Sequence, residues 1–294
     1  MPHDPAFIAP TYETCIVCGG KPLTETHIWP RWLKKVLPRQ KNHRTTRIIT
    51  QHGPGSRTSQ QRQVSQKFKR DSFLLAPYLA CSDCNGVWMK QFEDEVVLFL
   101  KDALEDKLDK ALTEQEQVSL AGWLALITIL AEYADNAPPT TGQKALLALQ
   151  KTRLPPDGFH IYVSRSKGPK WNQWYVYHNF HFNDAGLSHV RIMRDGRPRY
   201  NTQVTTMGIG NLLAHVFSGP DTTTLQSYSI AVEGSKLERI WPPKESFWVK
   251  QALWLRPQTL LKFPMKSEFS DNEADALAAT LKQRIAAMNR QPRT

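Results

Sequence analysis

The sequence contains little cysteine and no long apolar segment. Its longest apolar run, from Leu120 to Ala131, is too short to cross a bilayer and predicts a buried helix. The first residues lack a charged start followed by an apolar stretch, so we expect no signal peptide and a cytoplasmic protein without membrane contact. Cysteines of cytoplasmic proteins bind metal more often than they form disulfides.

Acidic residues are absent between Arg31 and Arg70. This segment holds twelve of the 38 Lys and Arg residues, and it accounts for the net charge of +11. A solvated surface usually mixes both signs, so the segment predicts an acidic partner, with nucleic acid as the first candidate. The predicted phosphate contacts are Arg31, Lys34, Lys35, Arg39, Lys41, Arg44 and Arg47.

All four cysteines fall into two CxxC pairs, Cys15/Cys18 and Cys81/Cys84. A CxxC turn places two thiolates on one side of a metal ion, and two such turns complete a tetrahedral zinc site. Four free cysteines or two disulfides are the alternative. A closed site of four thiolates leaves no open position on the metal, so this zinc is expected to be structural.

Helical periodicity dominates the middle of the chain. Apolar residues recur at spacings of three and four from Asn85 to Leu104. Thr113 and Glu116 form a capping-box pattern that opens a second helix, which extends through Tyr133. These patterns predict two helices directly after the second cysteine pair.

The C-terminal part has a different pattern. Aromatic and β-branched residues predict antiparallel strands over 159–165, 173–182, 187–193 and 200–207. Residues 209–217 predict a helix against this sheet, and a capping-box pattern at Ser270 predicts a terminal helix. The fold class is therefore α+β. The predicted domains are 1–110, with a basic insertion over 31–70, and 111–294, a helical and α+β domain of unassigned role.

The motifs CxxC, "HIWP" and "CSDCNGVWMKQFE" occur in an order that resembles the HNH endonuclease family, specifically its zinc-stabilised branch. The resemblance covers residues 15 to about 100. It implies a ββα-metal fold, in which a hairpin carries His27 and the start of a helix carries Asn85.

The resemblance also implies an activity, the metal-dependent hydrolysis of DNA phosphodiester bonds. His27 matches the general base, and Asn85 matches a ligand of a single catalytic Mg²⁺ or Mn²⁺ ion. The implied partner is double-stranded DNA, bound through the basic segment. Phage defence or a mobile element is the setting that the family suggests, and the C-terminal domain would bind a protein partner or a second copy.

Two positions depart from the family pattern. Thr26 stands directly before the base, where the family usually has an acid or a histidine, and Ala76 stands at the position of its middle Asn. Glu25 would point to the opposite face of a strand unless a bulge re-aims it. Glu93 is another possible substitute for the missing metal ligand. The alternative function is therefore a catalytically inactive, zinc-containing protein that binds nucleic acid on the same fold.

Several of these residues have an ordinary structural interpretation. His27 suits a hydrogen-bonded fold residue beside the zinc, and Asn85 suits a helix N-cap. Trp29 and Trp32 are expected to pack rather than to stack on bases. Strand alternation does not bring the four C-terminal histidines together as a ligand set. They are His160, His178, His181 and His189.

Overall fold

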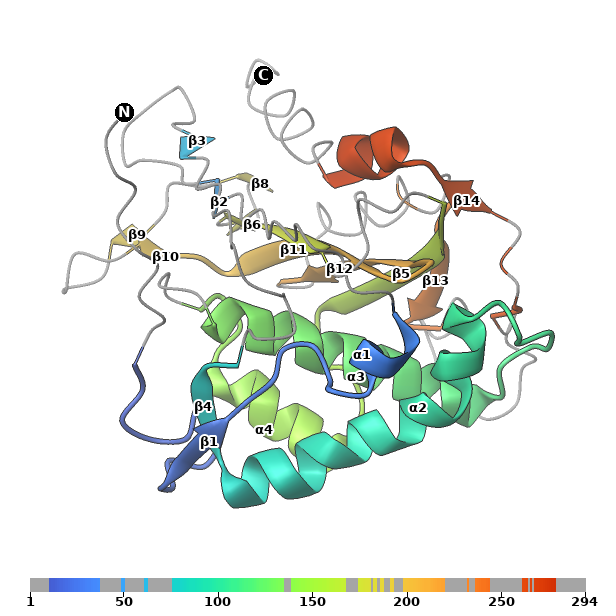
Figure 1. Cartoon of the computed structure of the whole chain (residues 1–294). Helices are drawn as coiled ribbons and strands as arrows, with labels where there is room; N and C mark the ends of the chain where they lie inside the picture. Colours follow the sequence, from blue (N-terminus) through green and yellow to red (C-terminus); the bar gives the residue numbers. More distant parts are fainter. Residues whose placement is uncertain are drawn as a thin grey trace, which may run out of the picture.

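The computed structural model of the chain describes residues 11–37, 49–50, 61–62, 76–134, 139–167, 174–180, 182–183, 186–187, 191–192, 198–219, 232, 236–243, 261–263, 265 and 267–278. For residues 49–50 and 61–62, and for the described residues between 174 and 199, the structure describes the backbone alone. The predicted α+β class is confirmed by helices packed on a mainly antiparallel sheet (Figure 1).

The main sheet has the order β13-β5-β12-β11-β6, and the short β14 pairs in parallel with β5. Its strands include three of the predicted ones, since β5, β6 and β11 cover 159–165, 173–182 and 200–207 almost completely. Of the region 187–193, the structure describes Leu187 and the two-residue β9, which lie in two separate two-stranded sheets outside the main one. The strand bounds are β5 (Phe159–Ser166), β6 (Trp174–Phe180), β9 (Arg191–Ile192), β11 (Thr202–Ile209), β12 (Leu212–Ser218), β13 (Glu238–Trp241) and β14 (Glu268–Phe269).

The helix predicted over 209–217 is wrong, because this segment forms strand β12. Ile209 pairs with Leu212, so Gly210 and Asn211 make a two-residue hairpin turn. Gly210 has a φ of 60°, which hairpin turns of this kind require. Every residue of β12 is buried, so its apolar run shows no alternation and cannot be told from a buried helix by periodicity.

Helix α3 (Glu114–Tyr133) lies between the sheet and helices α2 (Lys90–Leu104) and α4 (Gln143–Thr152) (Figure 1). The residues of its predicted apolar run are all buried, which confirms the buried helix. The capping box is also confirmed. Glu116 N donates to Thr113 Oγ1 at 3.2 Å, and Thr113 N donates to the Glu116 carboxylate at 2.8 Å.

The opposite face of the sheet is covered by a helix over residues 271–278 (Figure 1). A smaller apolar cluster forms there and includes Tyr162 and Leu213 of the sheet and Ala274 of the helix. The predicted cap is confirmed, since Ser270 N donates to the Glu273 carboxylate at 2.9 Å. The sheet is therefore buried on both faces, which explains why β12 lacks alternation.

Before α2 the chain forms a two-stranded antiparallel sheet, in which β1 (Leu23–Glu25) pairs with β4 (Tyr78–Cys81). A π-helical turn, η2 (Cys84–Met89), follows β4 and continues into α2. Two antiparallel strands thus precede a helix, with the short helix α1 (Leu33–Val36) between the strands. The remaining strands have two residues each: β2 (Ile49–Thr50), β3 (Gln61–Arg62), β7 (Phe182–Asn183), β8 (Gly186–Leu187) and β10 (Pro198–Arg199).

One apolar core extends across the proposed domain boundary at residue 110. It includes buried residues from Cys15 to Met265, and Trp32 meets Trp123 of α3 with ring centroids 6.4 Å apart. Packing of Trp29 and Trp32 is thereby confirmed. The division into 1–110 and 111–294 stays a prediction.

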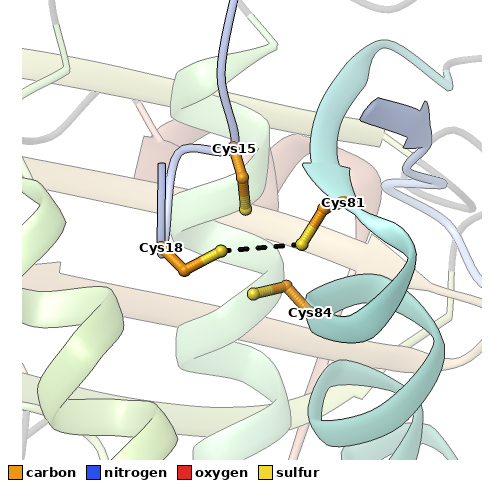
Figure 2. A group of neighbouring side chains, drawn as sticks. All are labelled: Cys15, Cys18, Cys81 and Cys84. Carbon is orange, nitrogen blue, oxygen red and sulfur yellow. Dashed lines mark hydrogen bonds between the residues drawn. The ribbon is translucent and has the colours of Figure 1, made fainter. Parts of the chain in front are cut away.

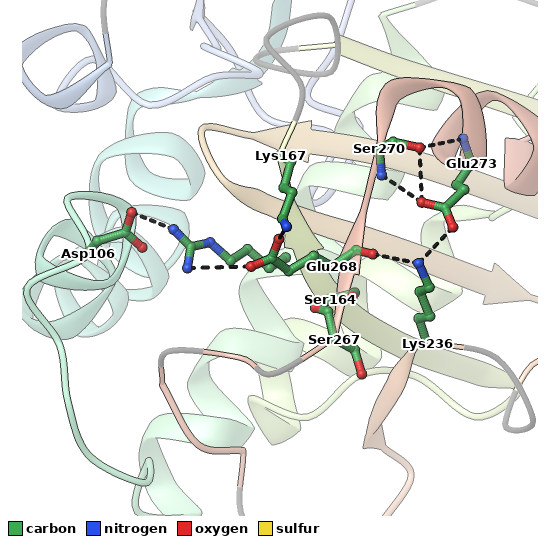
Figure 3. A network of polar contacts seen from close by, with 9 residues as sticks. Asp106, Ser164, Lys167, Lys236, Ser267, Glu268, Ser270 and Glu273 are labelled. Atoms are coloured by element: carbon green, nitrogen blue, oxygen red, sulfur yellow. Dashed lines mark hydrogen bonds and ion pairs between the residues drawn. The ribbon is translucent and has the colours of Figure 1, made fainter.

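A polar network also joins the end of α2 to the sheet. Arg165 of β5 donates to Asp106 at 2.7 Å, and Asn211 donates to the same carboxylate at 2.8 Å. Figure 3 shows how Lys167 and Lys236 approach Glu268 of β14 from opposite sides. The contact of Asn211 with Asp106 holds the hairpin turn of β11 and β12 against the end of α2.

The close approach of α2 and α3 predicts an unusual effect of alanine. A Cβ added at Gly122 would lie 2.6 Å from Phe92 Cε1 and 3.1 Å from the Arg153 carbonyl oxygen. We expect Gly122→Ala to lower the free energy of unfolding by about 1–3 kcal/mol, although alanine favours helices. The measurement is denaturant unfolding. Gly86→Ala, whose Cβ meets no atom within 4 Å, should leave stability unchanged or raise it. Equal stability of the two variants would contradict the packing.

Candidate functional site

The four cysteines converge at the junction of three segments. Cys15 and Cys18 lie on a turn closed by Cys15 N donating to Gly20 O at 3.0 Å and Gly19 N donating to Cys15 O at 2.9 Å. Cys81 ends β4, and Cys84 begins η2. Their sulfur atoms all lie within 4.8 Å of one another. Figure 2 shows the four side chains pointing toward one another.

The spacing of the sulfur atoms fits a metal ion. Cys18 Sγ lies 3.6 Å from Cys81 Sγ. Metal–sulfur bonds of about 2.3 Å in a tetrahedron place the sulfurs about 3.8 Å apart. Three of the cysteines are buried and Cys18 is exposed. The cluster could therefore hold a structural metal ion.

The thiols of this cluster differ in how readily they lose a proton. Burial opposes ionisation of Cys15, but backbone N–H groups of Cys18, Cys81 and Val17 outweigh burial and lower its pKa to about 7. Burial and the neighbouring thiols raise the pKa of Cys84. One thiolate thus forms readily, whereas a full set of thiolates needs a cation to compensate the charge.

The turn that carries the first cysteine pair is anchored to the rest of the fold. Ile16 N donates to Leu79 O of β4 at 3.0 Å, and Gln143 Nε2 of α4 donates to Val17 O at 2.7 Å. Gly20 is packed against the sulfurs, since a Cβ there would lie 3.2 Å from Cys18 Sγ. A side chain at this position would press into the cluster.

Thr26 is a structural residue of the β1–β4 pair. The register shifts between Thr24 and Glu25, and Thr26 follows this irregularity with only 1 % of its surface exposed. Its hydroxyl accepts from Ala80 N at 3.2 Å and donates to Thr24 O at 3.3 Å, while its N–H donates to Pro77 O. Thr26 therefore replaces strand hydrogen bonds that the irregularity removes, and it is not available as a metal ligand.

Asn85 ties the start of η2 to the end of β1. Its Nδ2 donates to Glu25 O at 2.9 Å and to Thr24 Oγ1 at 3.0 Å. Because the side chain acts as a donor, it does not cap the helix. The Asn85 Oδ1 atom bonds to no other part of the chain that the structure describes, which leaves it available to a cation or a water molecule.

His27 lies directly after this irregularity, half-buried. Arg31 Nε donates to His27 Nε2 at 3.2 Å, and Arg31 Nη2 lies 3.9 Å from the Glu25 carboxylate. Burial lowers the pKa of His27, and the charges of Arg31 and Lys34 lower it further against the opposing effect of Glu25. The imidazole is therefore neutral at pH 7, with a lone pair on Nε2.

The structure thus brings together some of the predicted site residues. Arg31 contacts His27, while Lys34 and Lys35 lie on the adjacent α1. Glu93 lies on α2, and burial raises its pKa to about 7. The predicted phosphate contacts Arg39, Lys41, Arg44 and Arg47 lie outside the described residues.

Of the four C-terminal histidines, only His160 has a side chain that the structure describes. His160 shares a sheet face with Tyr162, as predicted, and its ring meets Phe217 with centroids 6.0 Å apart. The side chains of His178, His181 and His189 lie outside the described part of the chain.

Arg153 has a role that the sequence does not suggest. It lies past the C-terminal end of α4 with a φ of 62°, and it donates to Trp88 O at 3.0 Å and to Glu95 Oε1 at 2.6 Å. Its guanidinium lies 3.7 Å from the centroid of the Phe92 ring. It therefore stabilises the π-helical turn that carries Cys84 and Asn85, over a sequence distance at which no local pattern operates.

No protein-family model, curated protein or solved structure matches this chain. Among the described helices, none is long and apolar enough to cross a membrane. The function of the chain is therefore inferred from its own residues and their geometry. The resemblance to HNH endonucleases rests on the sequence motifs alone.

The cysteine cluster predicts that the purified protein carries one metal ion per chain. We expect Cys84→Ser to lose this ion and several kcal/mol of stability, since structural zinc binds small peptides with about 10–16 kcal/mol. Metal analysis by mass spectrometry and thermal unfolding measure both effects. Ser82→Ala, an exposed position between Cys81 and Cys84, is the matched control. Full metal content in Cys84→Ser would contradict the site.

Proposed function

We propose that the chain is a zinc-stabilised, metal-dependent endonuclease of the HNH type that hydrolyses phosphodiester bonds of DNA. The observation that carries this proposal is the meeting of Glu25, His27 and Asn85 at the end of β1. Asn85 bonds to the Glu25 backbone at 2.9 Å, and Arg31 contacts both Glu25 and His27. Residues that can supply a carboxylate, an amide oxygen and an imidazole thus adjoin one another at the end of β1.

Zinc is the metal that best suits the four cysteines. It prefers four thiolates in a tetrahedron and has no redox chemistry, which suits a buried structural role. In this proposal zinc holds the turn of Cys15 and Cys18 against the junction of β4 and η2. The catalytic geometry then follows, because Asn85 is the residue after a zinc ligand.

A divalent Mg²⁺ or Mn²⁺ ion is the second metal of the proposal. The Glu25 carboxylate and Asn85 Oδ1 would hold such an ion in this proposal, because Mg²⁺ is usually held by one or two protein oxygens and keeps several water molecules. In the proposal Glu25 takes the place that Thr26 cannot fill, and the register shift between Thr24 and Glu25 supports this role, because a bulge can re-aim a side chain. The bound ion supplies charge neutralisation at the phosphate and the leaving oxygen.

His27 is the proposed general base. Burial lowers the pKa of His27 and so favours the neutral imidazole, and the hydrogen bond from Arg31 requires a lone pair on Nε2 that can accept a proton from the attacking water. Arg31 occupies this nitrogen in the free protein, and its exposed guanidinium can transfer to a phosphate of the substrate. Arg31 would then bind the DNA backbone and free Nε2 of His27 in a single movement.

The basic segment supports DNA as the substrate. Arg31 lies beside the proposed base, and Lys34 and Lys35 follow it on α1. Such contacts neutralise phosphates and make the affinity fall steeply with salt concentration. We place the scissile phosphate between these cations and the end of β1.

Thr26 favours a second candidate function, a nucleic-acid-binding protein without cleavage activity. Its hydroxyl is hydrogen-bonded to Ala80 N and Thr24 O within the β1–β4 pair. Only the Glu25 carboxylate then remains on β1 as an acidic ligand. If one carboxylate is too few, the zinc and the basic segment would still support binding.

Plasmid nicking with Mg²⁺ or Mn²⁺ tests the proposed function. We expect the wild-type chain to cleave, and His27→Ala and Glu25→Gln each to lose about 100-fold or more, since a general base contributes about 10²–10⁴-fold. Glu114→Gln, an exposed position on α3, is the control for charge. Zinc content should stay unchanged in all variants.

The outcomes separate the two functions. Salt-sensitive DNA binding without cleavage under either ion would select the inactive binding protein. Equal cleavage by Glu25→Gln and the wild type would contradict the role of Glu25 while leaving that of His27 open to its own variant.

A further inference from the structure

The indole of Trp88 is a buried hydrogen-bond donor close to the cysteine cluster. Trp88 follows Cys84 by four residues on η2, and residues four apart on a helix are neighbours on one face. Trp88 is only 6 % exposed, and its Nε1 atom has no hydrogen-bond partner in the part of the chain that the structure describes. An indole N–H can donate but cannot accept, so this buried group needs an acceptor.

The Cys84 sulfur is the acceptor that the Trp88 indole can serve. Burial raises the pKa of the Cys84 thiol, and the Trp88 side chain opposes this effect by acting as a donor to the sulfur. A neutral thiol is a weak acceptor, whereas hydrogen bonds to ionised groups are roughly twice as strong as those between neutral groups. Cysteines bind metal ions as thiolates. A metal ion in the cluster would therefore make the Cys84 sulfur a strong acceptor for this indole.

Cys84 depends on a side chain for the donor that other cysteines obtain from the backbone. Gly20 N donates to Cys18 Sγ at 3.4 Å, and three backbone N–H groups act on Cys15. For Cys84, the Trp88 indole acts as a donor, while the other three thiols raise its pKa. Four thiolates around one divalent ion keep a net negative charge, and buried charge requires hydrogen-bond donors. The indole supplies such a donor at the position where η2 begins.

Contacts with α2 and α4 hold Trp88 in place. Arg153, which follows α4, donates from Nη1 to Trp88 O at 3.0 Å. The Trp88 ring meets Phe92 of α2 edge-on, with ring centroids 6.1 Å apart. The Arg153 guanidinium in turn lies 3.7 Å from the centroid of the Phe92 ring. The orientation of the indole is thus supported by the packing of the helices as well as by the cluster.

We propose that Trp88 is a positioning residue of the metal site, whose indole N–H donates a hydrogen bond to the Cys84 thiolate when a metal ion is bound. Residues that bond to metal ligands orient those ligands, and their substitution typically lowers metal affinity by about 10–100-fold. Phenylalanine at this position would keep an aromatic ring but could not donate. The inference rests on the metal site of the proposed function, and it does not depend on whether the chain cleaves DNA.

Proton–cadmium NMR of the full-length wild-type chain loaded with Cd²⁺ tests the hydrogen bond directly. An N–H group bonded to a metal-bound sulfur is coupled to the metal nucleus through the hydrogen bond. We expect a correlation between cadmium and the Trp88 indole proton, assigned by its proximity to the Phe92 ring and by its loss in Trp88→Phe. The amide of Gly20, which donates to Cys18 Sγ, is the internal reference.

A correlation to the Gly20 amide without one to the Trp88 indole would overturn the inference. A chain that binds no Cd²⁺ would overturn it together with the cysteine site, whatever the result of plasmid nicking. The measurement on the wild-type chain decides the question even if Trp88→Phe does not fold.

Competition with a chelator measures the zinc affinity of matched variants. We expect Trp88→Phe to bind zinc about 10–100-fold more weakly than the wild type. Trp32→Phe should keep its affinity, since Trp32 Nε1 also lacks a described partner but its ring lies against Trp123 of α3. Phe92→Leu loosens the packing around the indole and keeps its N–H, so it should lose less affinity than Trp88→Phe. Wild-type affinity in Trp88→Phe, or an equal loss in Phe92→Leu, would contradict the role of the N–H.

Discussion

The convergence of four sulfur atoms is the constraint on which the arrangement of the candidate site depends. These atoms lie within 4.8 Å of one another although the two cysteine pairs are far apart in the sequence. They join the N-terminal turn to the junction of β4 and η2. Glu25 and Asn85 both lie beside these joined ends. A bound metal ion would therefore fix the site independently of the basic segment.

The end of β1 places a structural residue next to the proposed catalytic ones. Thr26 fills the irregularity in the β1–β4 pair and satisfies Ala80 N, a task for which a buried hydroxyl is suited and a carboxylate is not. The same irregularity leaves Glu25 exposed beside Arg31 and His27. Asn85 then holds the Glu25 backbone from the helix side. Stability and proposed chemistry are thus divided between neighbouring residues.

Local patterns predicted those features that local physics determines. The two CxxC pairs, the capping box at Thr113 and the buried run of α3 were readable because each of them depends on residues a few positions apart. Strand β12 was mistaken for a helix because a second layer, formed by residues 271–278, buries its outer face. The support of η2 by Arg153 could not be predicted, since it depends on how α4 packs. The sequence indicated the register shift beside Glu25 only as a condition for Glu25 to act as a metal ligand, because strand pairing is a long-range property.

Anomalous diffraction from crystals of the zinc-loaded chain soaked in Mn²⁺ tests the central claim most directly. It distinguishes the two metals by their absorption edges and locates each one. The account predicts a zinc peak at the centre of the four cysteine sulfurs and a manganese peak between the Glu25 carboxylate and Asn85 Oδ1. Zinc at the cysteines with manganese absent from the end of β1 would contradict the proposed catalytic site and leave only a nucleic-acid-binding fold.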